Sequence, residues 1–239
     1  MSLPYSMFAE IYDKTMALDY LPWANYIKEA YLAEKRKKPG SFLDLGCGTG
    51  GLTRIFPAKN KVGMDKSPQM LEIAQKNDPE TEYILADITN FQLNRKFDLI
   101  ISTHDTLNYI IDPDSAELLF SNIYDHLHPN GLFFGDIASE YNILKNFDKK
   151  ILEEDQDGLH LVWENNYDRL EGILTSKLRF YKNGILAGEE THLQRYYAMA
   201  EIEKMLAKSG LQLLATGSDY YSWEEEANSS LVTFMAKKI

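Results

Sequence analysis

The stretch LDLGCGTGGL at residues 43–52 decides the fold of this 239-residue chain. Apolar residues lead into it and glycines end it, which predicts a buried strand, a tight turn and the start of a helix. Glycine has no Cβ, so the backbone N–H groups of such a turn can approach a small ligand at the helix N-terminus. Gly46, Gly48 and Gly51 match the pattern G-x-G-x-x-G, and Asp65 ends the next apolar run about twenty positions later, as in a dinucleotide-binding site.

Asp44 narrows the choice of ligand. Its carboxylate precedes the first glycine by two residues, where it would repel a pyrophosphate and attract a cation. The string LDLGCGTG at residues 43–50 resembles the first motif of class I S-adenosylmethionine-dependent methyltransferases. The resemblance implies that this loop holds the methionine end of the cofactor, which carries an ammonium and a sulfonium. It also implies an open α/β sheet with the cofactor across the carboxyl ends of the first strands.

The rest of the chain alternates strands and helices. Further apolar runs predict strands at residues 61–65, 82–88, 97–102, 132–137, 211–216 and 230–237. The pairs Ser67-Pro68 and Asp112-Pro113 are typical of helix starts. The predicted fold class is therefore α/β, a Rossmann-like doubly wound sheet that is mostly parallel, with an antiparallel last strand.

An insertion interrupts this pattern after the fifth strand. Asp-Gly at residues 157–158 and Asn-Gly at residues 183–184 predict hairpins. The flanking alternation of apolar and polar residues predicts antiparallel strands at 159–167, 172–181 and 185–197. We therefore expect an S-adenosylmethionine-binding domain at residues 1–138 and 198–239 and an antiparallel β insertion at 139–197. The insertion resembles the sheet that covers the substrate in small-molecule methyltransferases, including sugar N-methylating enzymes and uncharacterised bacterial relatives.

Cofactor contacts are expected along the carboxyl edge of the sheet. The carboxylate of Asp65 can accept hydrogen bonds from both ribose hydroxyls. The resemblance implies that Asp87 receives the adenine amino group, with the backbone of Ile88 on the ring. It also implies that Met70 backs the adenine and that Tyr12 reaches the methionine end. Asp87 could equally be a turn residue, Met70 a core residue and Tyr12 part of an amphipathic helix. The full predicted set is Tyr12, Asp44, Gly46, Cys47, Gly48, Gly50, Asp65, Lys66, Met70, Asp87, Ile88 and Thr103.

Catalytic candidates lie in the loop at residues 103–109 and in the insertion. Methyl transfer is an in-line displacement that depends on alignment, and a base is needed when the acceptor arrives protonated. His104 is the first candidate base and His192 the second, because an imidazole titrates near neutral pH. Either could instead be a structural or solvent-facing histidine. The predicted substrate contacts are Asp105, Asn108, Tyr109, Arg195 and Tyr196. The other histidines, His126, His128 and His160, lack metal-ligand spacing, so no metal is predicted.

Composition limits the partners and the compartment. The net charge of −11 argues against a sequence-independent grip on nucleic-acid phosphates. Cys47 is the single cysteine of the sequence, which excludes an intrachain disulfide and fits a reducing compartment; its place in the glycine turn makes it a small filler. No signal peptide or apolar stretch of membrane-spanning length is recognisable. We expect a cytoplasmic monomer or homodimer without a nucleic-acid or membrane partner.

The predicted function is methyl transfer from S-adenosylmethionine to a small-molecule acceptor. Three alternatives remain open. An RNA (tRNA) methyltransferase would share the core, and a non-catalytic S-adenosylmethionine-binding protein would share the cofactor site. An NAD-dependent oxidoreductase would share the glycine pattern, but Asp44 counts against it.

Overall fold

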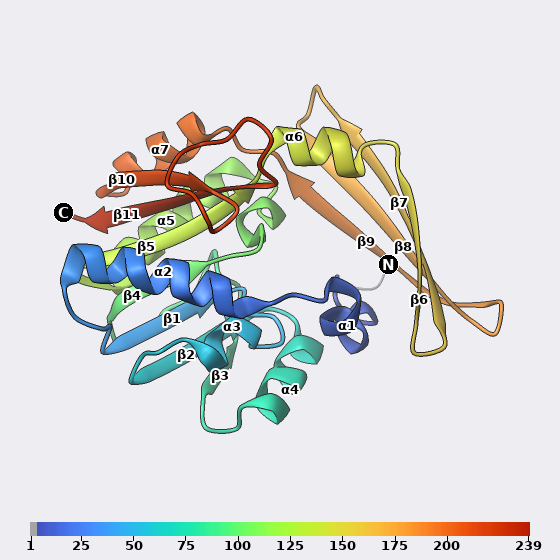
Figure 1. Cartoon of the computed structure of the whole chain (residues 1–239), viewed down its shortest axis with the longest axis horizontal. Coiled ribbons are helices and arrows are strands. Elements are labelled where there is room, and N and C mark those ends of the chain that lie inside the picture. The colour runs from blue at the N-terminus through green and yellow to red at the C-terminus, as the bar shows by residue number, and fades with distance from the viewer. Residues whose placement is uncertain (1–3) are drawn as a thin grey trace.

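A seven-stranded sheet forms the body of the protein, whose computed structural model describes residues 4–239 (Figure 1). The sheet order is β10-β11-β5-β4-β1-β2-β3. Its strands are β1 (Ser41–Leu45), β2 (Asn60–Asp65), β3 (Glu82–Leu85), β4 (Phe97–Ser102), β5 (Leu127–Ala138), β10 (Leu211–Ser218) and β11 (Leu231–Lys238). The last strand, β11, is antiparallel to both neighbours, and the pairs among β1 to β5 are parallel. The predicted fold class is confirmed.

Both faces of this sheet are buried. Phe42 of β1 and Leu99 of β4 are paired in register and point into one apolar core, whereas their successors Leu43 and Ile100 point into the other. Side chains alternate across a strand, so continuous apolar runs serve two cores at once. This explains why most residues of these two central strands are apolar.

Helices cover the two faces. They are α2 (Tyr20–Lys35), α3 (Gly51–Ile55), α4 (Pro68–Asn77), α5 (Pro113–His126) and α7 (Met199–Lys208). Residues of α2 and α3 pack on one side and residues of α5 and α7 on the other. Ser67 accepts the N–H of Met70, and Asp112 caps α5, so both predicted helix starts are correct. Asp19 caps α2, and Pro22 is the third residue of this helix.

The strand order creates a crevice at the carboxyl edge of the sheet. From β1 the chain builds β2 and β3 on one side, and then returns to place β4 and β5 on the other. Ligands of doubly wound sheets bind where the strand order reverses in this way. The glycine turn after β1 and the loop after β4 therefore face each other across this crevice.

A second sheet stands apart from the main layers at the right of Figure 1. It is antiparallel, with the order β6 (Ile151–Gln156), β7 (Leu159–Asp168), β8 (Ile173–Lys182) and β9 (Ile185–Arg195). A short helix, α6 (Glu140–Asn142), and a π-helical turn, η3 (Ile143–Phe147), lead into it. The sequence predicted three of these strands and missed β6, an edge strand. The two-domain division of the chain remains a prediction.

The N-terminal segment lies between the two sheets (Figure 1). It contains η1 (Phe8–Glu10) and α1 (Tyr12–Met16), two short helices in place of the single predicted one. Phe8 and Tyr12 pack against Met70 of α4 and against Leu178 and Phe180 of β8. The apolar contacts thus tie this segment to both halves of the fold. No helix within residues 4–239 has the length and apolar character needed to cross a bilayer.

Candidate functional site

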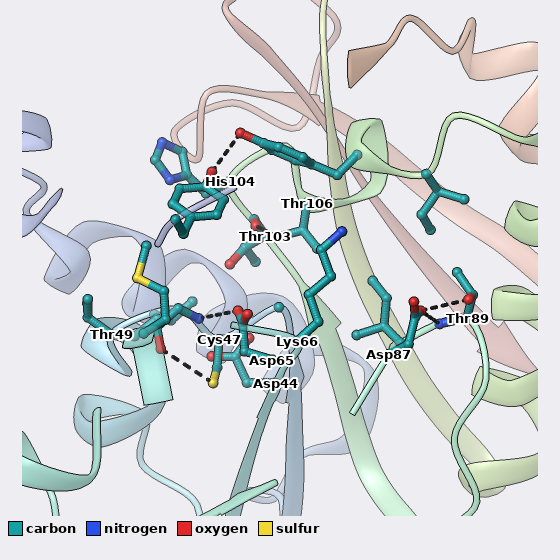
Figure 2. A pocket seen from close by; sticks show the side chains of 18 of the residues that line it. Asp44, Cys47, Thr49, Asp65, Lys66, Asp87, Thr89, Thr103, His104 and Thr106 are labelled. Carbon is teal, nitrogen blue, oxygen red and sulfur yellow. Dashed lines mark hydrogen bonds between the residues drawn. The ribbon is translucent and has the colours of Figure 1, made fainter. Parts of the chain in front are cut away.

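A cavity of about 380 Å³ opens at the carboxyl ends of β1, β2, β3 and β4. This volume lies within the range of small-molecule sites, roughly 300–1,000 Å³. In Figure 2 the carboxylates of Asp44 and Asp65 lie low in the view, with Asp87 at the right and His104 at the top. The predicted residues that line it are Tyr12, Asp44, Gly46, Cys47, Gly48, Asp65, Lys66, Met70, Asp87, Ile88, Thr103, His104 and Tyr109.

The glycine turn is held to the neighbouring strand by backbone hydrogen bonds. The N–H groups of Gly46 and Cys47 both donate to the carbonyl of Met64, at 2.7 and 3.0 Å. The N–H of Gly48 donates to Oδ2 of Asp65 at 2.9 Å. The turn therefore has a fixed shape before any ligand binds.

Positive φ angles and close contacts explain three of the glycines. Gly46 has φ +75°, and a Cβ there would lie 2.4 Å from Cγ2 of Thr106. A Cβ on Gly50, also at φ +75°, would lie 2.4 Å from the hydroxyl of Tyr83, so Gly50 serves packing below the turn. A Cβ on Gly48, at φ +52°, would meet nothing within 4 Å. Gly48, which lines the cavity, thus leaves its wall open to a ligand, whereas Gly46 makes room for the side chain of Thr106.

Asp44 is a buried carboxyl at the floor of the cavity, with 2% of its surface exposed. The Thr53 hydroxyl donates to its Oδ2 at 2.6 Å. Burial raises the pKa of Asp44 to about 7, against the opposing effect of the Thr53 hydrogen bond, and the nearby Asp65 adds to the rise. Within residues 4–239 no Lys or Arg forms an ion pair with Asp44. The floor is therefore ready to accept a cationic ligand.

Asp65 ends β2, and Asp87 lies two residues after β3, which stops at Leu85 although the sequence predicted a strand to residue 88. Asp65 accepts the N–H of Gly48 on one oxygen and the N–H of Ser67 on the other, and each oxygen keeps a second lone pair. Burial raises the pKa of Asp65 despite these hydrogen bonds. Oδ1 of Asp87 accepts the N–H and the hydroxyl of Thr89, the turn role that the sequence left open. Asp87 also lines the cavity, so the two roles are compatible.

Asp136 on β5 fixes the loop after β4. Its two oxygens accept the N–H groups of His104 and Asp105 at 2.7 and 2.6 Å, and the Tyr220 hydroxyl donates to Oδ2. His104 and Asp105 adopt φ angles of +57° and +51°, which are uncommon for residues other than glycine. Burial raises the pKa of Asp136 to about 6. Sequence analysis missed Asp136, although an acid inside an apolar strand is a signal that it has a partner.

The His104 imidazole lies against the cavity. Its Nδ1 is 2.7 Å from the Tyr12 hydroxyl, and its ring centroid is 5.4 Å from that of Trp23. Burial lowers the pKa of His104, and the negative charge of Asp136 opposes this only in part. The imidazole is therefore neutral at pH 7 and able to accept a proton.

Several of the predicted site residues are not among the described residues that line the cavity. They are Gly50, Asp105, Asn108, His192, Arg195 and Tyr196. Asn108 is fully buried and uses its amide structurally, donating to the carbonyl of Arg195 and accepting the N–H of Ala138. The Arg195 guanidinium covers the ring of Tyr197. Substrate contacts by Asn108, Arg195 and Tyr196 remain predictions, and the structure gives the first two of them packing roles.

Asp105 and His192 lie one layer behind the cavity wall. Asp105 accepts a hydrogen bond from Gln194 at 3.0 Å, and burial raises its pKa to about 7. His192 contacts the wall through Tyr109, whose hydroxyl is 3.0 Å from its Nδ1. Tyr5 lines the cavity beside Tyr109 but was absent from the predicted site. The aromatic richness of the N-terminal segment was the one signal that pointed to it.

Known proteins similar to this chain identify its family. A methyltransferase domain family matches residues 42–131. The putative methyltransferase YqeM of Bacillus subtilis (strain 168) is 30% identical, across 98% of this chain and 97% of that protein. The crystal structure of an S-adenosylmethionine-dependent methyltransferase from Clostridium acetobutylicum ATCC 824 is 31% identical with a TM-score of 0.85, covering 98% of both chains. This chain belongs to the S-adenosylmethionine-dependent methyltransferases.

Several relatives of this methyltransferase are named for their substrates, which include amino sugars and trans-aconitate. The dTDP-3-amino-3,4,6-trideoxy-alpha-D-glucopyranose N,N-dimethyltransferase of Streptomyces venezuelae is 23% identical, across 82% of this chain and 84% of that protein. The family membership makes S-adenosylmethionine the cofactor and sets aside the NAD-dependent and non-catalytic alternatives.

The cavity fits this cofactor chemically. S-Adenosylmethionine carries one carboxylate, but its ammonium, sulfonium, ribose diol and adenine amine are all cations or hydrogen-bond donors. The cavity wall offers these groups the carboxylates of Asp44, Asp65 and Asp87. Among the described residues, Lys66 is the one Lys or Arg that lines the cavity. The acidic wall therefore complements the cofactor.

Proposed function

We propose that this methyltransferase methylates an amine nitrogen of a small molecule. The observation that carries the proposal is the chemistry of the cavity wall opposite the glycine turn. Tyr5, Tyr12, Tyr109 and His104 meet there, all of them neutral hydrogen-bonding groups at pH 7. Neutral acceptor oxygens and a neutral imidazole suit an amine that arrives as an ammonium. A carboxylate acceptor would find no cation among them.

Each carboxylate of the floor has a role in this proposal. Asp44 holds the methionine ammonium, and Asp65 accepts the ribose hydroxyls through the lone pairs that its backbone donors leave free. Asp87 accepts the adenine amine on the side away from Thr89. The open position above Gly48 would let the methionine moiety approach the backbone.

The residues of the chain align the reactants and accept one proton from the substrate. The cofactor supplies a methyl group on a sulfonium, which is a good leaving group for in-line displacement. Alignment of the acceptor nitrogen at roughly 3–3.5 Å supplies much of the rate. The phenols orient the acceptor, and the neutral state of His104 makes it one acceptor for the ammonium proton.

The second sheet and the N-terminal segment together act as a lid in this proposal. Tyr5 and Tyr12 belong to the segment and line the cavity, while Phe8 packs on Phe180 of β8. A cover built in this way excludes water from the reacting atoms and shapes the room for the acceptor. The insertion at residues 139–197 would then choose the substrate.

The test is methyl transfer from S-adenosylmethionine carrying a ¹³C-labelled methyl group, followed by mass spectrometry. The acceptor panel contains amino sugars and their nucleotide derivatives, other primary and secondary amines, alcohols, carboxylic acids and tRNA. We expect label on an amine, with S-adenosylhomocysteine inhibiting the transfer. Label on carboxylic acids alone would contradict the amine assignment, and salt-dependent label on tRNA would favour the RNA alternative.

A further inference from the structure

A continuous chain of hydrogen bonds leads from the cavity wall into the second sheet. The Tyr5 and Tyr109 hydroxyls are 2.7 Å apart, and the Tyr109 hydroxyl is 3.0 Å from Nδ1 of His192. Nε2 of His192 is 2.9 Å from Oε2 of Glu190. Tyr5 and Tyr109 line the cavity, whereas His192 and Glu190 are 2% and 1% exposed. We call these four side chains the relay.

Glu190 is held as a carboxylate by the N-terminal segment. Its Oε2 accepts the N–H of Tyr5 at 2.9 Å, and its Oε1 accepts the Ser6 hydroxyl at 3.0 Å and the N–H of Phe8 at 3.1 Å. The N–H of Met7 also donates to Oε1. Burial raises the pKa of Glu190, but the hydrogen bonds from its neighbours outweigh burial and leave this pKa below its usual value.

An ionised Glu190 sets the direction of every bond in the relay. A carboxylate can only accept, so Nε2 of His192 must carry a hydrogen, and in the tautomer with hydrogen on Nε2 alone Nδ1 accepts. The Tyr109 hydroxyl therefore donates to Nδ1, and its oxygen accepts from Tyr5. The Tyr5 oxygen is then the end of the relay that can accept a hydrogen from a ligand in the cavity.

We propose that the relay carries the ammonium proton of the acceptor from the cavity to His192. The inference rests on the proposed amine acceptor. The N–H bond of the acceptor breaks and an O–H bond forms on Tyr5, while the Tyr5 proton moves to Tyr109 and the Tyr109 proton moves to Nδ1 of His192. The acceptor nitrogen keeps the electron pair that attacks the methyl group. Tyr5 is the catalytic residue, and the other members act through it.

The relay ends in a better site for the positive charge than His104. The imidazolium of His192 would lie 2.9 Å from the Glu190 carboxylate, whereas the ring of His104 has the Tyr12 hydroxyl as its hydrogen-bond partner. A hydrogen-bonded carboxylate stabilises an imidazolium more than a neutral hydroxyl does. The deeper histidine thus has a carboxylate beside it to balance the positive charge.

Other titratable groups facing the relay are Asp105, Asp65 and Tyr12. Asp105 lies close enough for its charge to act on both phenols and on His192. The negative charge of an ionised Asp105 or Asp65 favours movement of the proton into the relay. Tyr12 stays protonated, since burial raises its pKa well above the usual value.

The test measures how the rate of N-methylation depends on pH in Tyr109→Phe and His192→Asn. Phenylalanine breaks the relay, and the Asn amide oxygen can still accept from Tyr109 but cannot hold the proton. Tyr181→Phe, which removes a hydroxyl from β8 away from the cavity, is the matched control. The probe is dTDP-3-amino-3,4,6-trideoxy-α-D-glucopyranose. As the pH falls below the pKa of the probe's amine, the rate of each relay variant should drop about tenfold per pH unit from the plateau that the same variant reaches at high pH. The rates of wild type and control should drop far less.

Rescue by alkaline pH distinguishes a relay from a structural role. Above the pKa of the amine the acceptor arrives neutral, so the relay variants should come within about twofold of the wild-type rate. An equal loss at every pH would overturn the relay.

A direct measurement tests the relay without an acceptor. In ¹⁵N-histidine-labelled protein with S-adenosylhomocysteine, NMR should show His192 as the tautomer with hydrogen on Nε2. Hydrogen on Nδ1 would overturn the relay. The two proposals can fail separately. If NMR shows the Nε2 tautomer but the wild type methylates neither the probe nor any other amine, the proposed function is wrong, whereas the direction of the hydrogen bonds in the relay is confirmed.

Discussion

Cofactor binding should depend on pH through Asp44. The pKa of this carboxyl is about 7 in the free protein because the group is buried, so at pH 7 it is ionised in about half of the molecules. The cofactor's ammonium favours the carboxylate. At pH 6 about one molecule in eleven has the ionised form and at pH 8 about ten in eleven, so affinity should rise about tenfold, or about 1.4 kcal/mol, between these values.

The stability of the free protein should change in the opposite direction. The pKa of Asp44 is raised above its ordinary value of 3.8, so its contribution to stability is present below that value and is lost as the pH rises through 7. Asp105 and Asp136 shift in the same direction and share this trend. The rise in affinity belongs to Asp44, because the cofactor's ammonium would meet this carboxyl, whereas Asp65, whose pKa is also raised, would meet the uncharged ribose hydroxyls.

The assay is isothermal titration with S-adenosylhomocysteine at pH 6, 7 and 8 and constant ionic strength. In Asp44→Asn the amide oxygen can still accept from Thr53, but the charge is gone. We expect a loss of about 1.5–3 kcal/mol at pH 8 and a flat pH dependence. Asp114→Asn, which changes an exposed carboxylate in the first turn of α5, is the control and should behave as wild type. Equal affinity of Asp44→Asn and wild type at pH 8 would refute the reasoning.

Four further substitutions test the geometry. Gly46→Ala would place a Cβ on a residue with a left-handed backbone and 2.4 Å from Cγ2 of Thr106. It should lower the free energy of unfolding, measured in urea, by about 2–5 kcal/mol. Gly184→Ala, at the same φ but in open space, should cost about 1–2 kcal/mol, and equal costs would count against the contact. Asp136→Asn should cost about 2–3 kcal/mol in the same assay, since one of two backbone donors loses its acceptor; an unchanged midpoint would contradict this. Glu190→Gln should speed amide hydrogen exchange at residues 5–8, and unchanged exchange would show that other contacts hold the segment.

Local signals were enough to predict the main sheet. The apolar runs, the glycine turn and the caps Ser67 and Asp112 each act within a few residues, so the sequence displays them directly. Asp44 was predicted to contact the cofactor because it precedes the glycine turn and Asp65 because it ends the next strand, and both line the cavity since the carboxyl ends of parallel strands meet at one edge.

The missed features depend on contacts between distant residues or on weak local patterns. Strand β6 is charged and largely exposed, so it shows no apolar alternation. Asp136 acts on a loop more than thirty residues earlier in the chain, and Glu190 binds Tyr5 across a separation of 185 residues. No local sequence pattern indicates such pairings. Asn108 was predicted to contact substrate because it lies in the loop after β4. Its amide instead joins two strands that are distant in the sequence, which no local pattern shows.

The most direct test of the site is parallel isothermal titration of the protein with S-adenosylmethionine, S-adenosylhomocysteine and NAD. We predict micromolar binding of the first two and no heat from NAD, because the acidic floor attracts an ammonium and repels a pyrophosphate. Binding of NAD alone, or no binding of any of the three, would contradict the assignment of the cavity as the cofactor site.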